Sequence, residues 1–181
     1  MFNTILVAFD GSDHASWALN KAIEIAKTDH SSIIVFHSIM HYYRPMKSYS
    51  IPFLSFKMED YGLDAKSDEL VYQSHKDLGE RLLAEAKKKV DAAGVKCEAK
   101  LVENRGPVDA AKELVDSLGI DLVIVGAKGI HNAIERAVLG SVSSGIVNNV
   151  CSNVLVMRSE CAASHGSVLT EQKKPKGKSK T

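Results

Sequence analysis

The chain has 181 residues, of which 45 % are hydrophobic and 25 % are charged, with a formal net charge of +1 at pH 7. These values fit one soluble globular domain with a core of its own. No apolar run approaches the roughly 20 residues that a membrane-spanning helix requires, and the first residues form a strand and a turn instead of a signal peptide. Three widely spaced cysteines favour reduced thiols in a cytoplasmic protein over a disulfide framework or a zinc site, and we expect Cys97 and Cys151 in the core.

Strands and helices alternate in the first half of the chain. Thr4–Phe9 predicts a buried strand, after which Ser12 or Asp13 is a suitable helix N-cap. The next helix has apolar residues at three- and four-residue steps, at Ala15, Ala18, Leu19, Ala22, Ile23 and Ala26. Ser32–Ile39 predicts a second strand, and Ser67–Ala93 a long helix that Gly94 ends. The expected apolar side of this long helix comprises Val71, Leu78, Leu82, Ala86 and Val90.

The connection between the second strand and the long helix, residues 41–66, is longer than most connections in compact domains. It carries most of the aromatic residues of the chain, at Tyr42, Tyr43, Tyr49, Phe53, Phe56 and Tyr61. It leaves the second strand at the end that faces a ligand in an α/β sheet. We interpret it as a flap over a ligand or a contact to another subunit, or else as a variable insertion packed on its own domain.

The second half of the chain continues the alternation. Val95–Val102 predicts a less buried strand, and Pro107 opens a helix. The expected inner residues of that helix are Val108, Ala111, Leu114, Val115 and Leu118. The apolar run 120–125 predicts another buried strand, followed by a helix from about Ser141 to Cys151 and a last strand over Asn153–Arg158.

The charge is distributed unevenly between the body of the chain and its end. Residues 1–159 hold 18 basic and 20 acidic residues, whereas residues 160–181 hold five lysines and two glutamates. The terminal stretch lacks periodicity, and we interpret it as a disordered basic tail. Such a tail solubilises a protein, and it can also make weak contacts with nucleic acid.

This order of elements predicts a single-domain α/β fold over residues 1–159. Helical crossovers between strands indicate an open, parallel, five-stranded sheet with helices on both faces, a Rossmann-like and nucleotide-binding architecture. A ligand in such a sheet lies outside the carboxyl ends of the strands, where the strand order reverses. Three turns are therefore expected to meet there: residues 9–11, 38–40 and 126–129.

Glycines follow the buried strand 120–125 directly. The chain reads GAKG at Gly126 to Gly129, then ten residues, then GSVSSG from Gly140. Backbone N–H groups in a glycine-rich turn and at a helix start carry a partial positive field, so such a place binds phosphate. A Gly-x-x-Gly turn alone is equally a tight connection between a strand and a helix. Its combination with Asp10-Gly11-Ser12 and with the Gly-Ser-Val-Ser motif that starts at Gly140, in one α/β layout, favours a nucleotide site.

These motifs resemble those of the universal stress proteins, over about residues 2–158. The resemblance is carried by ILVAFDGS at the first strand end, VFHS at the second, and DLVIVGAKG, LGSVSSGIV and VLVM in the last third. The chain departs from the pattern of the ATP-binding branch in three places. It has ten residues instead of nine between Gly129 and Gly140, Asn153 where proline is frequent, and Ser38 where an apolar residue is common.

The resemblance implies an adenine-nucleotide site, for ATP or a related nucleotide with or without Mg²⁺. Asp10 would face the ribose, and the backbone of Ala8, Phe9, Ser38 and Val125 would lie near adenine. Gly126 and Gly129 would let the backbone approach the ribose and phosphates. Backbone N–H groups and hydroxyls would hold the phosphates at Gly140, Ser141, Val142 and Ser143. The resemblance also implies a homodimer through the strand 153–158.

Each residue also has a plainer interpretation. Asp10 and Ser141 can be N-caps, Lys128 a surface lysine, and His37 a hydrogen-bonded histidine inside a strand. Three functions compete: a nucleotide-binding regulatory protein of the stress response without turnover, an ATP-hydrolysing or phosphotransfer enzyme, and a dimeric scaffold without nucleotide. The chain lacks a phosphate-loop motif ending in Gly-Lys-Ser/Thr, which disfavours the enzyme. The intact glycine and serine motifs disfavour the scaffold. We therefore expect the regulatory protein, with no membrane contact.

Overall fold

The computed structural model describes residues 1–40, 65–128 and 139–158. The tail 160–181, Gly129 and nearly all of the segment 41–66 lie outside this part of the chain. The elements run in the predicted order: β1 Thr4–Ala8, α1 Asp13–Asp29, β2 Ser32–Ile39, α2 Ala65–Ala92, β3 Cys97–Glu103, α3 Pro107–Leu118, β4 Leu122–Gly126, α4 Ser141–Asn149 and β5 Asn153–Met157.

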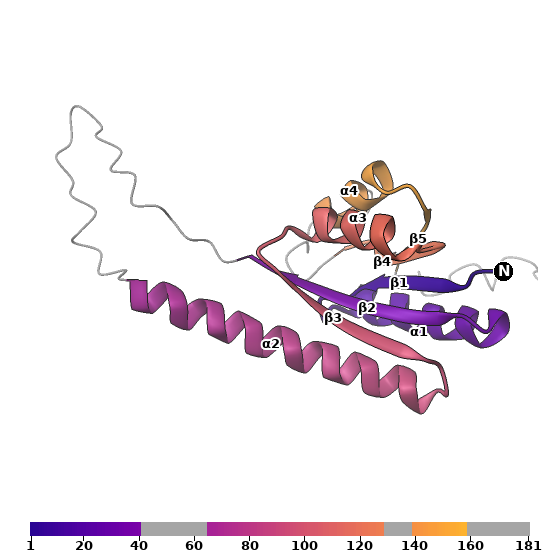
Figure 1. Ribbon diagram of the computed structural model, residues 1–181, viewed down its shortest axis with the longest axis horizontal. Helices are drawn as coiled ribbons and strands as arrows, with labels where there is room; N and C mark the ends of the chain where they lie inside the picture. The colour runs from indigo at the N-terminus through magenta and orange to yellow at the C-terminus, as the bar shows by residue number, and fades with distance from the viewer. Residues whose placement is uncertain (41–64, 129–138, 159–181) are drawn as a thin grey trace, which may run out of the picture.

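The five strands form one parallel sheet in the order β3-β2-β1-β4-β5. Helices α1 and α2 cover one face and α3 and α4 the other (Figure 1). The predicted α/β class and the parallel sheet with helices on both faces are therefore confirmed. The chain runs outward from the central strand β1 twice, first to β2 and β3 and then to β4 and β5, so the strand order reverses between β1 and β4.

The central strand β1 is covered on both faces. Ile5, Leu6 and Val7 are fully buried, as the uninterrupted apolar run predicts. Ile5 and Val7 pack against α1 and α2, whereas Leu6 packs against α3 and α4. Helix α1 begins at the expected cap, because the Ser12 hydroxyl oxygen accepts the Ala15 N–H at 3.2 Å.

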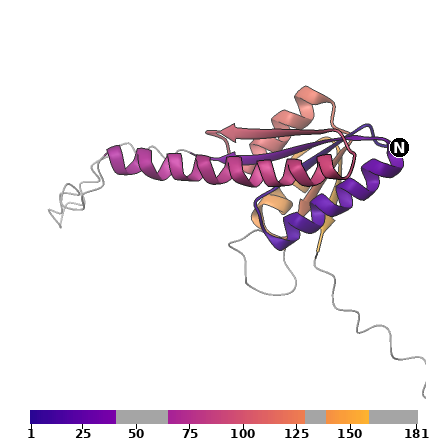
Figure 2. The same cartoon turned by 90° about the horizontal axis from the view of Figure 1, so that it is seen from below.

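Helix α2 differs from the prediction in the direction of its apolar side. Val71 and Leu78 are 55 % and 54 % exposed, and the buried side chains are Leu83, Ala86 and Val90. The first turns of α2 project beyond the carboxyl ends of the strands (Figures 1 and 2), and farther along the helix the buried Gly79, and not Leu78, faces His37 and Leu101 of the sheet. Periodicity shows which residues share a helix side, but it does not show where the supporting sheet ends.

Smaller differences concern the ends of α3 and α4. Leu118, expected inside, is 42 % exposed because it is the last residue of α3, and Ala110 is buried instead. Cys151, also expected inside, is exposed because α4 already ends at Asn149. Cys97 on β3 is half-buried, and burial raises the pKa of its thiol.

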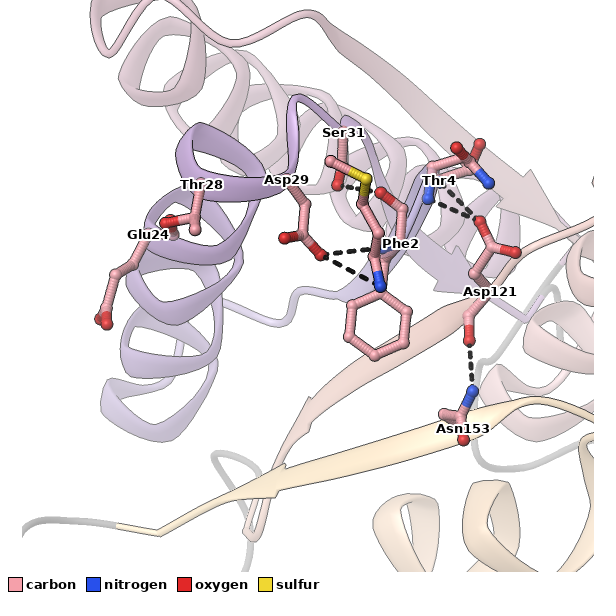
Figure 3. A network of polar contacts seen from close by, with 10 residues as sticks. Phe2, Thr4, Glu24, Thr28, Asp29, Ser31, Asp121 and Asn153 are labelled. Carbon is pink, nitrogen blue, oxygen red and sulfur yellow. Dashed lines mark hydrogen bonds and ion pairs between the residues drawn. The ribbon is translucent and has the colours of Figure 1, made fainter.

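A polar network closes the amino ends of the strands (Figure 3). One carboxylate oxygen of Asp121 accepts the backbone N–H groups of Asn3 and Thr4 at 2.8 and 3.0 Å. These hydrogen bonds favour the charged form and lower the pKa of the Asp121 carboxyl below its usual value. The Asn153 side chain donates to the Asp121 carbonyl at 3.0 Å. Two further bonds tie the chain start to the end of α1: Phe2 N–H to Asp29 at 2.8 Å and the Ser31 hydroxyl to the Phe2 carbonyl at 2.6 Å.

Candidate functional site

A cavity of about 230 Å³ opens at the carboxyl ends of the strands, where β1 and β4 separate. Pairing between these two strands ends at Val7 and Ile124. By contrast, β1 stays paired with β2 as far as Ala8, and β4 with β5 as far as Gly126. The cavity therefore lies at the reversal of strand order, the general position of ligands in open α/β sheets.

The cavity brings together the predicted site residues that the structure describes: Ala8, Phe9, Asp10, Ser38, Val125, Gly126, Gly140, Ser141, Val142 and Ser143. The remaining predicted residue, Gly129, lies outside the described part. Six further residues line the cavity without having been predicted as site residues: Ser12, Ala15, Phe36, His37, Pro107 and Lys128. The three predicted turns thus meet, and the start of α3 joins them.

One wall of the cavity is formed by the sheet face that carries α3 and α4. Ala8, Phe36 and Val125 contribute apolar side chains to that face. The Phe9 N–H donates to the Phe36 carbonyl at 2.9 Å, so it is already engaged. The Phe9 carbonyl lies 2.7 Å from Nδ1 of His37, and a carbonyl only accepts, so Nδ1 carries the proton. His37 is therefore a hydrogen-bonded strand histidine, as predicted.

Asp10 follows β1 at the rim of the cavity. One of its carboxylate oxygens accepts the Ser12 N–H at 3.0 Å, which fixes the side chain. The other oxygen has no hydrogen-bond partner among the described residues. Because Ser12 is the N-cap of α1, Asp10 does not serve as that cap. The site therefore presents an acceptor with one oxygen available at this rim.

The start of α4 presents donors to the cavity. Gly140 is the N-cap, which excludes Ser141 from that role. The Gly140 N–H donates to the Ala127 carbonyl at 2.7 Å, and the first helical bond runs from Ser144 N–H to the Gly140 carbonyl at 2.9 Å. The N–H groups of residues 141–143 therefore have no acceptor within the described part of the chain, as is general for a first helical turn.

The hydroxyls of Ser141 and Ser143 differ in availability. Ser143 is 1 % exposed, and its hydroxyl lies 3.0 Å from the carbonyl oxygens of both Ala127 and Gly140. This hydroxyl braces the turn before α4. The Ser141 hydroxyl is exposed and has no partner among the described residues. Ser143 thus offers the cavity its N–H group, and Ser141 offers both an N–H and a hydroxyl.

The start of α3 lines the same cavity with nearly the same backbone but different chemistry. The N-caps Gly106 and Gly140 have φ, ψ of −65°, 152° and −61°, 160°. The first helical residue is Pro107 in α3, which has no N–H, and Ser141 in α4. The first turn of α3 contains Asp109, whereas that of α4 contains no acidic residue. The positive end of the α4 dipole is therefore the uncompensated one.

Gly126 has a structural role besides any role toward a ligand. A Cβ atom at this position would lie 2.7 Å from the backbone carbonyl carbon of His14 and 2.9 Å from the Ala15 nitrogen. The absence of a side chain lets the first turn of α1 lie directly against the end of β4. Gly126 thereby sets the distance between two walls of the cavity.

Metal-binding clusters and membrane-spanning helices are both absent from the described ranges. No group of three or more His, Cys, Asp or Glu side chains there could hold a metal ion. No helix there has both the length and the apolar content to cross a membrane.

Comparison with known proteins identifies related sequences. Residues 1–158 match the model of the universal stress protein family. A chain of Staphylococcus haemolyticus that carries the name universal stress protein is 32 % identical over 160 residues, which cover 88 % of this chain and 86 % of that one. A counterpart from Staphylococcus epidermidis is 34 % identical with the same coverage.

Solved structures show the same fold. A universal stress protein in complex with cAMP has a TM-score of 0.56 and 25 % identity, covering 87 % of this chain and 97 % of that one. The universal stress protein of Archaeoglobus fulgidus in complex with dAMP has a TM-score of 0.56 and 19 % identity, with coverages of 87 % and 98 %. A family member of Arabidopsis thaliana with AMP bound has a TM-score of 0.55 and 18 % identity, with coverages of 86 % and 91 %.

Proposed function

The chain belongs to the universal stress protein family, and we propose that it is a regulatory protein of the stress response that binds ATP or another adenine nucleotide in this cavity. The observation that carries the proposal is the start of α4, where three backbone N–H groups, which have no acceptor among the described residues, line a cavity at the reversal of strand order. Bound cAMP, dAMP and AMP in three structural neighbours support the choice of an adenine nucleotide.

We place the phosphates at the start of α4. Phosphate oxygens accept hydrogen bonds and carry negative charge, and both properties match a helix start whose first N–H groups have no intrahelical acceptor. The start of α3 is the less favourable place, because Pro107 lacks a donor and Asp109 adds a negative charge. Lys128 adds a basic side chain to the cavity lining. The predicted residue Gly129 remains part of this proposal.

The other two walls of the cavity suggest positions for the ribose and the base. The second carboxylate oxygen of Asp10, which has no partner in the described ranges, accepts hydrogen bonds and repels phosphate, so it suits the ribose hydroxyls. The apolar wall of Ala8, Phe36 and Val125 suits the flat face of a base. Asp10 therefore lies between the base and phosphate ends, and the nucleotide crosses from β2 toward α4.

We propose binding without turnover. Asp10 is the one carboxylate among the described residues that line the cavity, and it faces the ribose in this arrangement. Mg²⁺ would therefore arrive with the nucleotide phosphates. Single-turnover measurements with ATP test this part, and release of phosphate at an enzymatic rate would contradict it.

A pair of variants at Ser141 tests the phosphate position. Proline is favoured as the first helical residue, and the φ, ψ of −61°, 160° at Gly140 suit the residue before a proline. Ser141→Pro therefore removes one free N–H and one hydroxyl while α4 stays intact. Ser141→Ala removes the hydroxyl alone. A hydrogen bond to a charged group is worth about 1.5–3 kcal/mol.

Calorimetry with ATP should show a loss of roughly 10- to 100-fold in affinity for Ser141→Pro and a much smaller loss for Ser141→Ala. Circular dichroism checks that both variants are folded. If the folded Ser141→Pro and Ser141→Ala variants bind ATP with equal affinity, the proposed position of the phosphates at the start of α4 is contradicted.

We also propose a cytoplasmic homodimer that pairs through β5. This strand lies at the edge of the sheet, and its apolar residues Val154 to Met157 are only half-buried in one chain. An apolar edge strand needs a cover, and a two-fold pair of identical strands provides one. Sedimentation that detects only the 19.7 kDa chain at micromolar concentrations would contradict the dimer.

A further inference from the structure

We infer that Ser38 recognises the base: its hydroxyl donates to a ring nitrogen of adenine, and it disfavours ligands that offer no acceptor at that place. The inference rests on the proposed binding of an adenine nucleotide and adds the determinant of base selectivity.

The position of Ser38 follows from strand geometry. It is the second-last residue of β2 and lies beside Val102 of β3. Because side chains alternate along a strand, Ser38 shares the sheet face of Phe36, the face that carries α3 and α4. It is half-buried, it lines the cavity, and its hydroxyl has no hydrogen-bond partner among the described residues.

The surroundings of Ser38 are otherwise apolar or already paired. Ala8, Phe36 and Val125 are apolar, and the Phe9 N–H is engaged with the Phe36 carbonyl. The neighbouring His37 points to the opposite sheet face and binds the Phe9 carbonyl. Its ring also lies against α2, where a Cβ atom on Gly79 would come within 2.9 Å of Cδ2. Within the described wall, Ser38 therefore supplies the available polar side-chain group.

A single hydroxyl in an apolar wall favours bases that accept its hydrogen bond, and it also disfavours bases that leave it without a partner. A base that fills this end of the cavity displaces the water that solvates the hydroxyl. If the base offers an acceptor, the bond to water is replaced; if it offers a C–H group, the hydroxyl is left buried and unpaired. Sites built to hydrogen-bond a ligand discriminate strongly for this reason. Adenine carries ring acceptors at N1, N3 and N7, on all of its exposed edges.

The test uses AMP and its 1-deaza, 3-deaza and 7-deaza analogues, each of which replaces one ring nitrogen by C–H. Calorimetry should show that the unsubstituted protein binds one of the three about 10-fold or more weakly than AMP. Ser38→Ala should weaken AMP binding about 5- to 10-fold and should bind that same analogue more tightly than the unsubstituted protein does. Ser38→Thr keeps the hydroxyl and should keep the discrimination.

The matched control is Ser32→Ala, at the other end of the same strand, where the hydroxyl lies 3.5 Å from the Asn3 carbonyl. It should leave all four affinities unchanged. If AMP binds but the three analogues lose the same affinity in the unsubstituted protein and in Ser38→Ala, the inference is overturned and the proposed function stands. If the unsubstituted protein binds no adenine nucleotide, the proposed function itself fails.

Discussion

The two ends of the sheet use their polar groups in opposite ways. At the amino ends of the strands, the Asp121 carboxylate and the Asn153 amide are hydrogen-bonded to backbone (Figure 3). At the carboxyl ends, the first N–H groups of α4, the Ser38 hydroxyl and one oxygen of Asp10 have no partner within the described residues. In the proposed function, this difference separates groups that hold the fold together from groups that bind the ligand. Substitutions at the first end should change stability, and substitutions at the second should change binding.

The largest expected effect comes from Ser141→Asp. Its carboxylate would occupy the donors at the start of α4 and repel phosphate, so the affinity for ATP should fall by about 100-fold or more. The same charge should raise the free energy of unfolding by about 0.3–1 kcal/mol, because α4 has no acidic residue in its first turn. Calorimetry and urea unfolding measure the two effects.

The uncharged control for this variant is Ser141→Asn, which has nearly the same size. It should retain most of the ATP affinity and gain little stability. A loss of affinity as large as that of Ser141→Asp would show that bulk, and not charge, is what the start of α4 excludes.

A smaller effect is expected for Gly126→Ala. Unlike the other substitutions at the carboxyl ends of the strands, it should lower both stability and ATP affinity. The new methyl group would lie 2.7 Å from the backbone of α1, so the end of β4 and the first turn of α1 must move apart. We expect about 1–3 kcal/mol lower stability and a several-fold weaker affinity for ATP. The control is Gly106→Ala, where the added atom has only Asp109 at 3.8 Å. Equal stability of the two variants would refute the close contact.

The smallest effect is expected at the amino ends of the strands, where Asp121 is hydrogen-bonded, and it depends on pH. The pKa of Asp121 is lowered in the folded state, so its carboxylate stabilises the fold above the unfolded value of 3.8, and this contribution is lost as the pH falls through the lowered pKa. Asp121→Asn should therefore unfold at lower urea than the unsubstituted protein at pH 6, and the gap should narrow toward pH 3. Its ATP affinity at pH 6 should be unchanged. If the difference in stability between the two proteins increases as the pH falls, the stabilising role of the Asp121 carboxylate is contradicted.

Much of the fold could be predicted from the sequence because buried parallel strands and amphipathic helices have distinct periodicities. The apolar runs near Thr4 and Leu122 predicted central strands, and Gly94 and Pro107 marked helix ends where the structure has them. The exposure of Val71 and Leu78 was not predictable, because it depends on how far α2 extends past the sheet and on which of its sides, the one with Gly79, lies against β2 and β3.

The sequence predicted ten of the residues that line the candidate site, but it did not predict the other six or the individual role of each. The order of strands and helices was enough to bring Asp10, Ser38 and Gly126 to one edge. The bracing role of the Ser143 hydroxyl and the contact of Gly126 with α1 depend on distances between elements, which no local pattern encodes. Pro107 was missed as a lining residue although a signal existed, since the helix after any parallel strand begins at the same edge as the ligand.

The central position of β1 has a consequence for the time course of folding. Of the strands of this sheet, β1 is synthesised first and pairs on one side with β2 soon afterwards, whereas its other partner, β4, lies near the far end of the domain. Until Leu122–Gly126 has been synthesised, one apolar edge of β1 stays open to misassociation. The cavity borders this late junction, so a ligand can assist only the final step of folding, after both halves of the sheet have met.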